Sequence, residues 1–488
     1  MSLYKNLFKQ TAIYGLATVL PRMLSFLLVR LYTDVLPEEG YGEVSIVFSY
    51  IVLFNVILAY GMETAFFRFY NSDENKSVEN TSTISLFWSS IMFLGIGLLF
   101  RHELSGASGI DVRFITYTVW ILVLDALVIV PFSKLRAQGR PMMYAAIKIG
   151  NVIVNLGFNL FFLLWLPKLA ATHPQSIMSS IYVQNFEIGY IFISNVIASL
   201  LTFIVVTPHY FKIKWQFNKA LWLRMMQYSL PVMVAGIAFA VNETFDRILL
   251  EKILPLPENL AKAEVGVYSA CYKLALFMTL YATAFRLGIE PFFFSYAKNE
   301  SATKTYALIT QYFVVFGSVI LLVVVVFSDI LKQIFINNQD YWEGMKVVPL
   351  IILANFFLGI YHNLSVWYKL SDKTRIGAYI SIVGAIVTIG LNFALIPKYS
   401  YVGSAIATLA AYGSMMIISW YMGNKYYPVP YNLKKIGGYL LLSTGFSMLY
   451  FYGFRENYIV GAAVILLYGG FIYYNEKEIL LRIIKRKQ

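Results

Sequence analysis

Long apolar stretches alternate with short polar connections along the whole chain. A helix needs about 20 mostly apolar residues to cross a bilayer, and fourteen stretches meet this condition. They cover residues 11–33, 43–67, 83–100, 112–133, 143–166, 182–207, 223–245, 265–289, 305–329, 346–369, 376–396, 400–422, 436–453 and 457–474. The connections between them are too short to fold as separate domains. The pattern therefore predicts an all-α polytopic membrane protein with about 14 transmembrane helices.

The two halves of this series resemble each other. Three features recur in the same order and at similar separations along the chain: Pro21 with Pro231, Glu63 with Glu290, and Gly157 with Gly390. Six helices separate the members of each pair, so the two halves have the same orientation in the membrane. Such a parallel repeat is related by a pseudo-twofold axis along the membrane normal. We expect an N-terminal lobe at 1–222, a C-terminal lobe at 223–435, and two additional helices with a tail at 436–488.

Charge gives the predicted orientation. Only 13% of the residues are charged, against about a quarter in soluble domains. With the N-terminus in the cytoplasm, cytoplasmic segments carry more than twice as many Lys and Arg as the opposite loops, which predicts cytoplasmic N- and C-termini. This distribution of Lys and Arg accounts for the net charge of +13, which therefore does not indicate a nucleic acid partner. We expect the first helix to be retained, since no cleavage site follows it, and the basic tail at 475–488 to contact lipid headgroups.

The residues that usually carry catalysis or bind metals show no recognisable pattern. The chain has a single cysteine, Cys271, and four histidines without metal-ligand spacing. It has no phosphate-binding glycine loop and no nucleophile–base set. We therefore expect no enzyme activity, no catalytic residues, no metal and no cofactor.

Two motifs resemble a known family. One runs from Glu39-Gly40-Tyr41-Gly42 through the second helix to Tyr60-Gly61-Met62-Glu63-Thr64-Ala65-Phe66-Phe67-Arg68, and the other is Leu391-Asn392-Phe393-Ala394-Leu395-Ile396-Pro397. They are similar to the polysaccharide biosynthesis flippases of the multidrug/oligosaccharidyl-lipid/polysaccharide exporter superfamily.

The resemblance implies a function. A two-lobed, monomeric bundle in the bacterial inner membrane would move an undecaprenyl-diphosphate-linked oligosaccharide from the cytoplasmic to the periplasmic leaflet by alternating access. Its partners would be this lipid-linked substrate and membrane lipids, with H⁺ and Na⁺ both open as coupling ions.

Three alternatives stay open. Lipid II flippases carry the pattern Ser-Arg-x-x-Gly-Phe-x-Arg-Asp in the first helix, of which this chain keeps Arg22 and Phe26 but not the Gly, the second Arg or the Asp. Multidrug exporters often use a carboxylate inside the first helix, whereas Asp34 lies past its end. A membrane-embedded glycosyltransferase or polymerase is disfavoured by the short loops.

Basic residues inside the apolar stretches are the candidates for substrate binding, because charges in the membrane are costly and usually functional. Arg22 and Lys273 are the deepest, and Arg30 and Arg286 lie nearer to helix ends, where snorkelling to the interface is an equal alternative. Lys273 and Arg286 are thirteen residues apart, or about 220° on a regular helix. An undistorted eighth helix would therefore not aim both at one cavity.

Acidic residues are the candidates for coupling or gating. Asp125 lies in the middle of the fourth helix, where it could alternatively pair with Arg22 or Lys273. Glu243 is four residues from Arg247, a spacing typical of an ion pair on one helix face. Glu63 and Glu290 occupy equivalent cytoplasmic ends of the two halves, where gate contact and simple solvation are both open.

Overall fold

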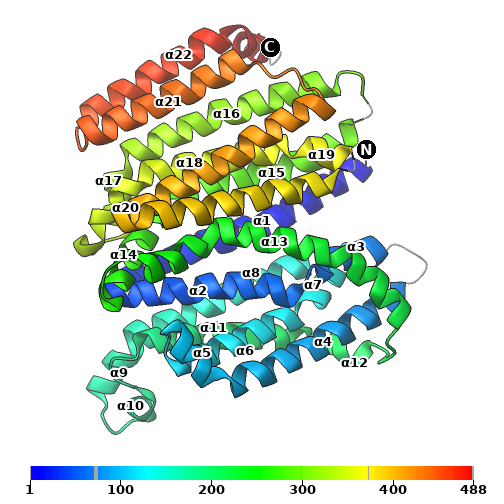
Figure 1. Cartoon of the computed structure of the whole chain (residues 1–488), viewed down its shortest axis with the longest axis vertical. Coiled ribbons are helices and arrows are strands. Elements are labelled where there is room, and N and C mark those ends of the chain that lie inside the picture. Colours follow the sequence, from blue (N-terminus) through cyan, green and yellow to red (C-terminus); the bar gives the residue numbers. More distant parts are fainter. Residues whose placement is uncertain (1, 71–74, 298, 372, 486–488) are drawn as a thin grey trace. The chain divides into compact units, whose positions relative to one another are not determined.

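The chain is built from helices joined by short turns (Figure 1). The computed structural model describes residues 2–70, 75–297, 299–371 and 373–485, and this part of the chain contains no strand. Twelve of its helical segments are long and apolar enough to cross a membrane. The predicted all-α polytopic class is therefore confirmed.

The helices in the first half of the chain correspond to the first six predicted spans and their connections. They are α1 (Ser2–Val35), α2 (Glu38–Ala59), α3 (Met62–Tyr70), α4 (Asn75–Leu99), α5 (Arg101–Ser108), α6 (Val112–Leu127), α7 (Ile129–Ala137), α8 (Pro141–Leu160), the π-helical η1 (Phe161–Trp165), α9 (Leu166–Thr172), α10 (Ile177–Ile181), α11 (Glu187–Val206) and α12 (Pro208–Lys212).

The second half of the chain supplies the remaining helices. They are α13 (Lys219–Ile253), α14 (Glu258–Tyr272), the 3₁₀ segment η2 (Lys273–Ala275), α15 (Leu276–Tyr296), α16 (Ala302–Val326), α17 (Ser328–Phe335), the 3₁₀ segment η3 (Gln339–Val347), α18 (Val348–Leu364), α19 (Val366–Leu370), α20 (Thr374–Tyr426), α21 (Leu433–Gly453) and α22 (Tyr458–Lys485).

Every predicted span coincides with one of these helices or with a consecutive group of them, and two spans share α20. This helix breaks at Ser400, whose φ of 48° and ψ of −138° are not helical. Pro397, three residues earlier, removes a backbone donor at the same place. The eleventh and twelfth spans are therefore two helices joined without a loop. The thirteenth span is helix α21, which is rich in Gly, Ser and Tyr and is not among the twelve most apolar segments.

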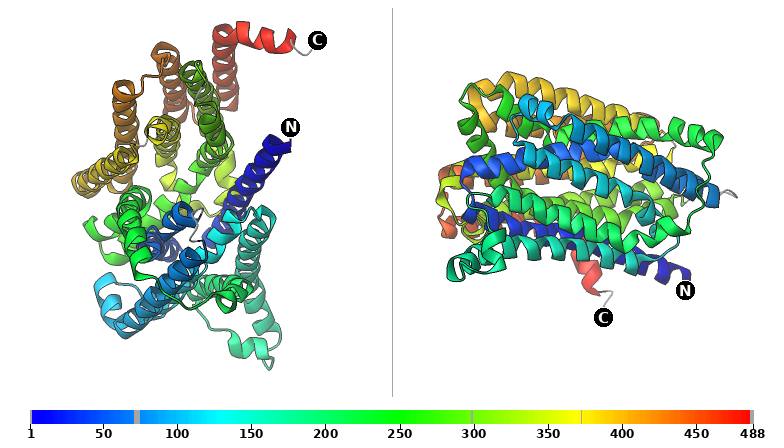
Figure 2. Two further views of the ribbon diagram at one scale, coloured as in Figure 1. Left: turned by 90° about the vertical axis from the view of Figure 1, so that its right-hand side faces the viewer. Right: turned by 90° about the horizontal axis from the view of Figure 1, so that it is seen from below.

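The contacts between helices divide the chain into two compact units. The first comprises residues 1–269 and 381–404, and the second comprises 270–380 and 405–488. In the first unit α1 packs on α8, and α2 packs on α6 and α13. In the second, α16 packs on α15, α18, α21 and α22. The long helices of each unit run beside one another, as two further views show (Figure 2). The lobe boundaries at 222 and 435 stay a prediction from the repeat.

A buried asparagine occurs at the same place in each half of the repeat. Asn159 in α8 and Asn392 in α20 are both fully buried. Each donates from its side-chain amide to the backbone carbonyl four residues earlier, that of Asn155 at 2.8 Å and that of Thr388 at 2.7 Å. The repeat seen in the sequence is thus also a repeat of hydrogen bonds.

These asparagine turns are also bonded to the first helix of their own half. The Tyr32 hydroxyl of α1 donates to the Asn159 side-chain oxygen at 3.0 Å. The Thr388 hydroxyl donates to the Asn242 side-chain oxygen of α13 at 2.8 Å. Tyr32 and Asn242 are as far apart along the chain as the two prolines of the repeat. Buried polar groups that pair in this way fix the register of the helices they join.

The predicted basic tail at 475–488 is helical up to Lys485 as the last part of α22. Its lipid contact is an expectation that falls largely outside the residues whose side chains the structure describes. The side chains of Lys5 and Lys9, which precede the first span, also lie outside the part of the chain whose side chains the structure describes.

Candidate functional site

Arg22 lies on the packed side of α1. At 100° per residue it is within about 40° of Phe26, Val29 and Thr33 around the helix axis, and all three are buried. Arg22 and Ser25 are nevertheless exposed. The side of α1 that carries Arg22 is therefore closely packed toward the C-terminal end of the helix and exposed around Arg22.

Arg30 has different surroundings on the same helix. It lies within about 60° of Met23 and Leu27, two large apolar side chains that are about half exposed. Its Nε is 3.7 Å from the Asp34 carboxylate, one helical turn further on. Arg30 thus lies beside exposed apolar side chains and pairs with Asp34, which makes it a weaker candidate for binding an anionic ligand.

Lys273 and Arg286 belong to the second unit, and the helix between them is irregular. Lys273 opens the 3₁₀ segment η2 and is exposed, and Arg286 in α15 is half-buried. A 3₁₀ helix turns about 120° per residue, so three such residues add about 60° to the rotation of a regular helix. The two cations are then separated by about 80° instead of about 140°. The assumption of an undistorted eighth helix was wrong. Helix geometry therefore no longer excludes that Lys273 and Arg286 point toward the same side.

Asp125 makes polar contacts with three neighbouring helices of the first unit. The Ser199 hydroxyl of α11 donates to its carboxylate at 2.8 Å, and the Asn55 side chain of α2 also bonds to it. The Lys148 ammonium of α8 is the nearby opposite charge. A carboxylate with a hydroxyl, an amide and a cation around it can exchange a proton or hold a small cation, so the geometry keeps Asp125 as a coupling candidate.

Glu63 and Glu290 each form an ion pair within their own half. The Glu63 carboxylate of α3 pairs with Arg136 of α7. The Glu290 carboxylate of α15 lies 2.6 Å from Lys369 of α19. Arg136 and Lys369 have the same separation along the chain as the repeated glycines of the two halves, so the acid and the base are both repeated. The sequence analysis did not identify these bases, although this equal spacing could have revealed them.

Glu243 is exposed on α13. Arg247, its expected partner, pairs with Asp246 instead. The Arg247 guanidinium lies 3.0 Å from the Asp246 carboxylate and donates to the backbone carbonyl of Glu243, also at 3.0 Å. Tyr268 of α14 donates to the other Asp246 oxygen at 2.6 Å. Asp246 thus joins α13 to α14.

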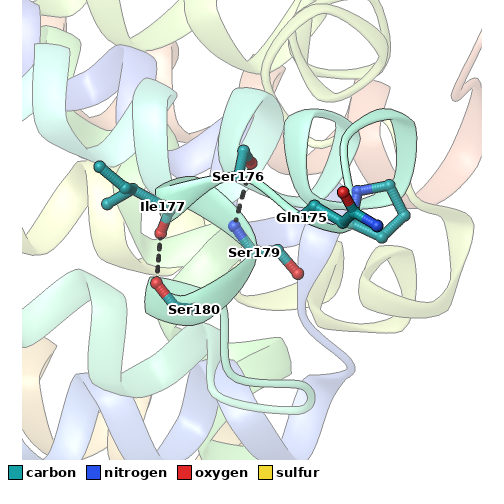
Figure 3. A pocket seen from close by; sticks show the side chains of 6 residues that line it. Gln175, Ser176, Ile177, Ser179 and Ser180 are labelled. Carbon is teal, nitrogen blue, oxygen red and sulfur yellow. Dashed lines mark hydrogen bonds between the residues drawn. The ribbon is translucent and has the colours of Figure 1, made fainter.

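A pocket near α10 is not lined by any of the candidate site residues. It is lined by Pro174, Gln175, Ser176, Ile177, Ser179 and Ser180, all from one short segment (Figure 3). The Ser176 hydroxyl accepts from the Ser179 backbone amide, and Ser180 donates to the Ile177 carbonyl. The pocket contains no charged side chain and none of the predicted site residues. Among the described residues, no three His, Cys, Asp or Glu side chains come together as a metal site.

Comparison with known proteins identifies relatives at the level of sequence. The family described as "Polysaccharide biosynthesis protein" matches residues 7–286, which is more than half of the chain, and the MatE family matches residues 258–394. An uncharacterized membrane protein of Haemophilus influenzae is 20% identical over 79% of this chain and 89% of its own length. The "Lsg locus putative protein 1" of the same organism is 20% identical over 82% of this chain and 94% of its own.

Solved structures show the same fold. The lipid II flippase MurJ in an inward closed conformation superposes with a TM-score of 0.72 at 15% identity, covering 95% of this chain and 99% of MurJ. An inward-facing multidrug resistance MATE transporter of the MOP superfamily gives a TM-score of 0.60 at 11% identity, covering 86% of this chain and 95% of that one.

Proposed function

Because the chain belongs to the polysaccharide biosynthesis protein family of membrane transporters, we propose that it is a flippase for an undecaprenyl-diphosphate-linked oligosaccharide. It would carry this lipid from the cytoplasmic to the periplasmic leaflet of the bacterial inner membrane. The observation that carries the proposal is the position of Arg22, a cation within a membrane span that is exposed on the packed side of its helix.

The chemistry of the substrate fits such a site. A diphosphate and its sugars lose their hydration on entering the membrane, which is costly unless the protein supplies charge and hydrogen bonds. A guanidinium can hold two phosphate oxygens at once. The polyprenyl tail needs no such site, because it stays in the bilayer. Each repeated half has buried hydrogen bonds of its own, and alternating access would require the two halves to move relative to each other.

A deletion strain tests the proposed function. We expect lipid-linked glycan to accumulate in the cytoplasmic leaflet and surface glycan to be lost, and both to be restored by the wild-type gene. The measurement is extraction and mass analysis of the polyprenyl-diphosphate lipids together with surface labelling of the glycan. Normal surface glycan combined with a new sensitivity to amphiphilic drugs would reject the proposal.

A lipid II flippase would use the same diphosphate chemistry. The identity of the accumulated lipid separates the two substrates, since a peptidoglycan precursor carries a peptide and the proposed oligosaccharide lipid does not.

The main alternative of another kind is a cation-coupled exporter of small amphiphilic drugs, and the surroundings of Asp125 favour it. If a carboxylate couples transport to an ion, then Asp125→Asn should strongly reduce transport and flatten its pH dependence. Glu243→Gln is the comparison variant, because Glu243 is exposed and Asp125 is bonded to Ser199. Transport measured across a range of pH in both variants decides the point. An unchanged rate and pH profile in both would exclude carboxylate coupling at these positions.

A further inference from the structure

One end of the first unit joins helices from both halves of the repeat. Helices α2 and α5 of the first half meet α13 and α14 of the second half there. The loops at this end, 100–111 and 254–257, are expected to face the periplasm. Figure 1 shows α14 beside the start of α2.

The backbones of α2 and α14 cross in direct contact at two glycines. A Cβ on Gly42 would lie 1.8 Å from the Lys262 carbonyl oxygen, and a Cβ on Gly266 would lie 2.0 Å from the Glu38 carbonyl oxygen. No other residue leaves room for this approach. Gly42 and Gly266 follow Tyr41 and Val265 in the equivalent motifs of the two halves, so each half contributes the same small residue to the crossing.

Two lysines from the second half bind the end of α5 in the first half. Lys252 Nζ donates to the Ser108 carbonyl at 2.8 Å, and Lys262 Nζ donates to the Gly109 carbonyl at 3.2 Å. The last carbonyls of a helix have no partner within it and carry the negative end of the helix dipole. The two ammonium groups therefore satisfy acceptors that would otherwise need water.

Carboxylates hold these lysines in place. Lys262 is almost completely buried and lies 2.9 Å from Glu258 in the preceding turn of α14. Lys252 lies 3.4 Å from Glu251, whose side chain is only 1% exposed. Glu43 of α2 is a further opposite charge near Lys262. A buried ammonium in such a cluster is costly to separate from its partners.

We propose that Gly42, Gly266, Lys252 and Lys262 form an outer latch that holds the two halves of the repeat together at this end. The latch must open for substrate to leave at this end, when α14 withdraws from α2 and both lysines leave the carbonyls of α5. The role of the latch in transport rests on the proposed function and on the predicted orientation. The contacts that form the latch depend on neither.

Distance measurement between two spin labels tests the latch directly. Ala107 in α5 and Leu256 between α13 and α14 are both exposed, so cysteines at these positions can carry the labels. Cys271→Ser removes the single native cysteine and keeps a donor to the Tyr341 carbonyl. The labelled full-length protein is reconstituted in lipid nanodiscs without substrate, and the distance distribution is recorded by pulsed electron spin resonance.

We expect one short distance in the otherwise unmodified protein. Lys252→Met combined with Lys262→Met removes the charge-assisted bonds and should raise the ratio of long to short distances about tenfold or more. Gly266→Ala should have the same effect by a separate route, since its methyl group collides with the backbone of α2. Lys346→Met is the matched control, because Lys346 pairs with Glu343 on an exposed surface, and it should leave the distances unchanged.

If the lysine double variant and Gly266→Ala both keep the short distance, the latch does not exist. The two lysine substitutions add no bulk, so they remain informative even where the alanine variant fails to fold. Because no substrate is used, a failure of the deletion strain to accumulate glycan lipid would reject the proposed function and leave this result standing.

Discussion

Replacing Arg22 with alanine is expected to abolish glycan export while the protein still reaches the membrane. The guanidinium is exposed on the packed side of α1, so the alanine variant should lose the proposed contacts with the ligand. A charge-assisted contact contributes about 1.5–3 kcal/mol, so export should fall more than about tenfold. Surface glycan labelling measures export, and an immunoblot of the membrane fraction measures the protein. Arg22→Lys should keep part of the activity, because an ammonium cannot bind two phosphate oxygens in the same way.

Arg30→Ala is the matched control on the same helix. Arg30 shares its charge with Asp34 and lies beside exposed apolar side chains, so this variant should keep most of the export. Lys273→Ala in the second unit should behave like Arg22→Ala. Full export by Arg22→Ala, or an equal loss in Arg22→Ala and Arg30→Ala, would contradict the assignment of Arg22 to the substrate.

Replacing Asp329 with asparagine is expected to lower the free energy of unfolding by about 3 kcal/mol. Asp329 in α17 is 1% exposed and accepts from the Arg455 guanidinium at 2.7 and 3.0 Å. Its carboxylate also lies 2.6 Å from Lys332 Nζ. Asparagine keeps the shape but removes the buried counter-charge of two cations and leaves only the exposed Glu456 near Lys332. Thermal unfolding of the detergent-solubilised protein, followed by tryptophan fluorescence, measures the change.

The same cluster predicts a dependence on pH. Burial alone would raise the pKa of Asp329, but hydrogen bonds and positive charge from Arg455 and Lys332 outweigh it and hold the pKa below its ordinary value. A carboxyl whose pKa is lower in the folded state stabilises the protein above its unfolded-state pKa, about 3.9. This stabilisation is lost as the pH falls through the folded-state pKa. The difference between the wild type and Asp329→Asn should therefore be full at neutral pH and shrink in acid below about pH 4.

Asp111→Asn provides the comparison. Its pair with Arg113 is largely exposed, and exposed pairs contribute little to stability. A loss of stability as large as that of Asp329→Asn would show that the effect does not depend on burial. A difference between wild type and Asp329→Asn that grows, instead of shrinking, as the pH falls below about 4 would contradict the lowered pKa.

Hydropathy predicted every helical span, because apolar length is a property of consecutive residues. It did not predict the partners of the charged side chains. Glu63 was recognised as one member of a repeated pair, but Arg136 lies several helices further along the chain, and only the packing of α3 on α7 brings the two together. Hydropathy carries no information about long-range contacts of this kind, and only the equal spacing of Arg136 and Lys369 in the repeat points to them.

Lys262 and Lys273 show where local reasoning was insufficient. Lys262 falls between the predicted spans 223–245 and 265–289, yet α14 begins at Glu258 and Lys262 is buried in it. The 3₁₀ segment that starts at Lys273 contains no Gly or Pro to mark it. The burial of Lys262 depends on another helix as well as on Glu258, since a carbonyl at the end of α5 accepts from its ammonium.

The break at Ser400 matters to anyone who wishes to insert a tag into this protein. The chain doubles back there so sharply that a Cβ on Gly403 would touch the backbone of Leu395, and the Ser400 hydroxyl donates to Glu264. An epitope or protease site placed at this hairpin would have to displace helical residues on both sides, so we expect it to be poorly tolerated. The exposed turn at 173–175 has few bonds to the helices around it and is the better place for a cleavable reporter.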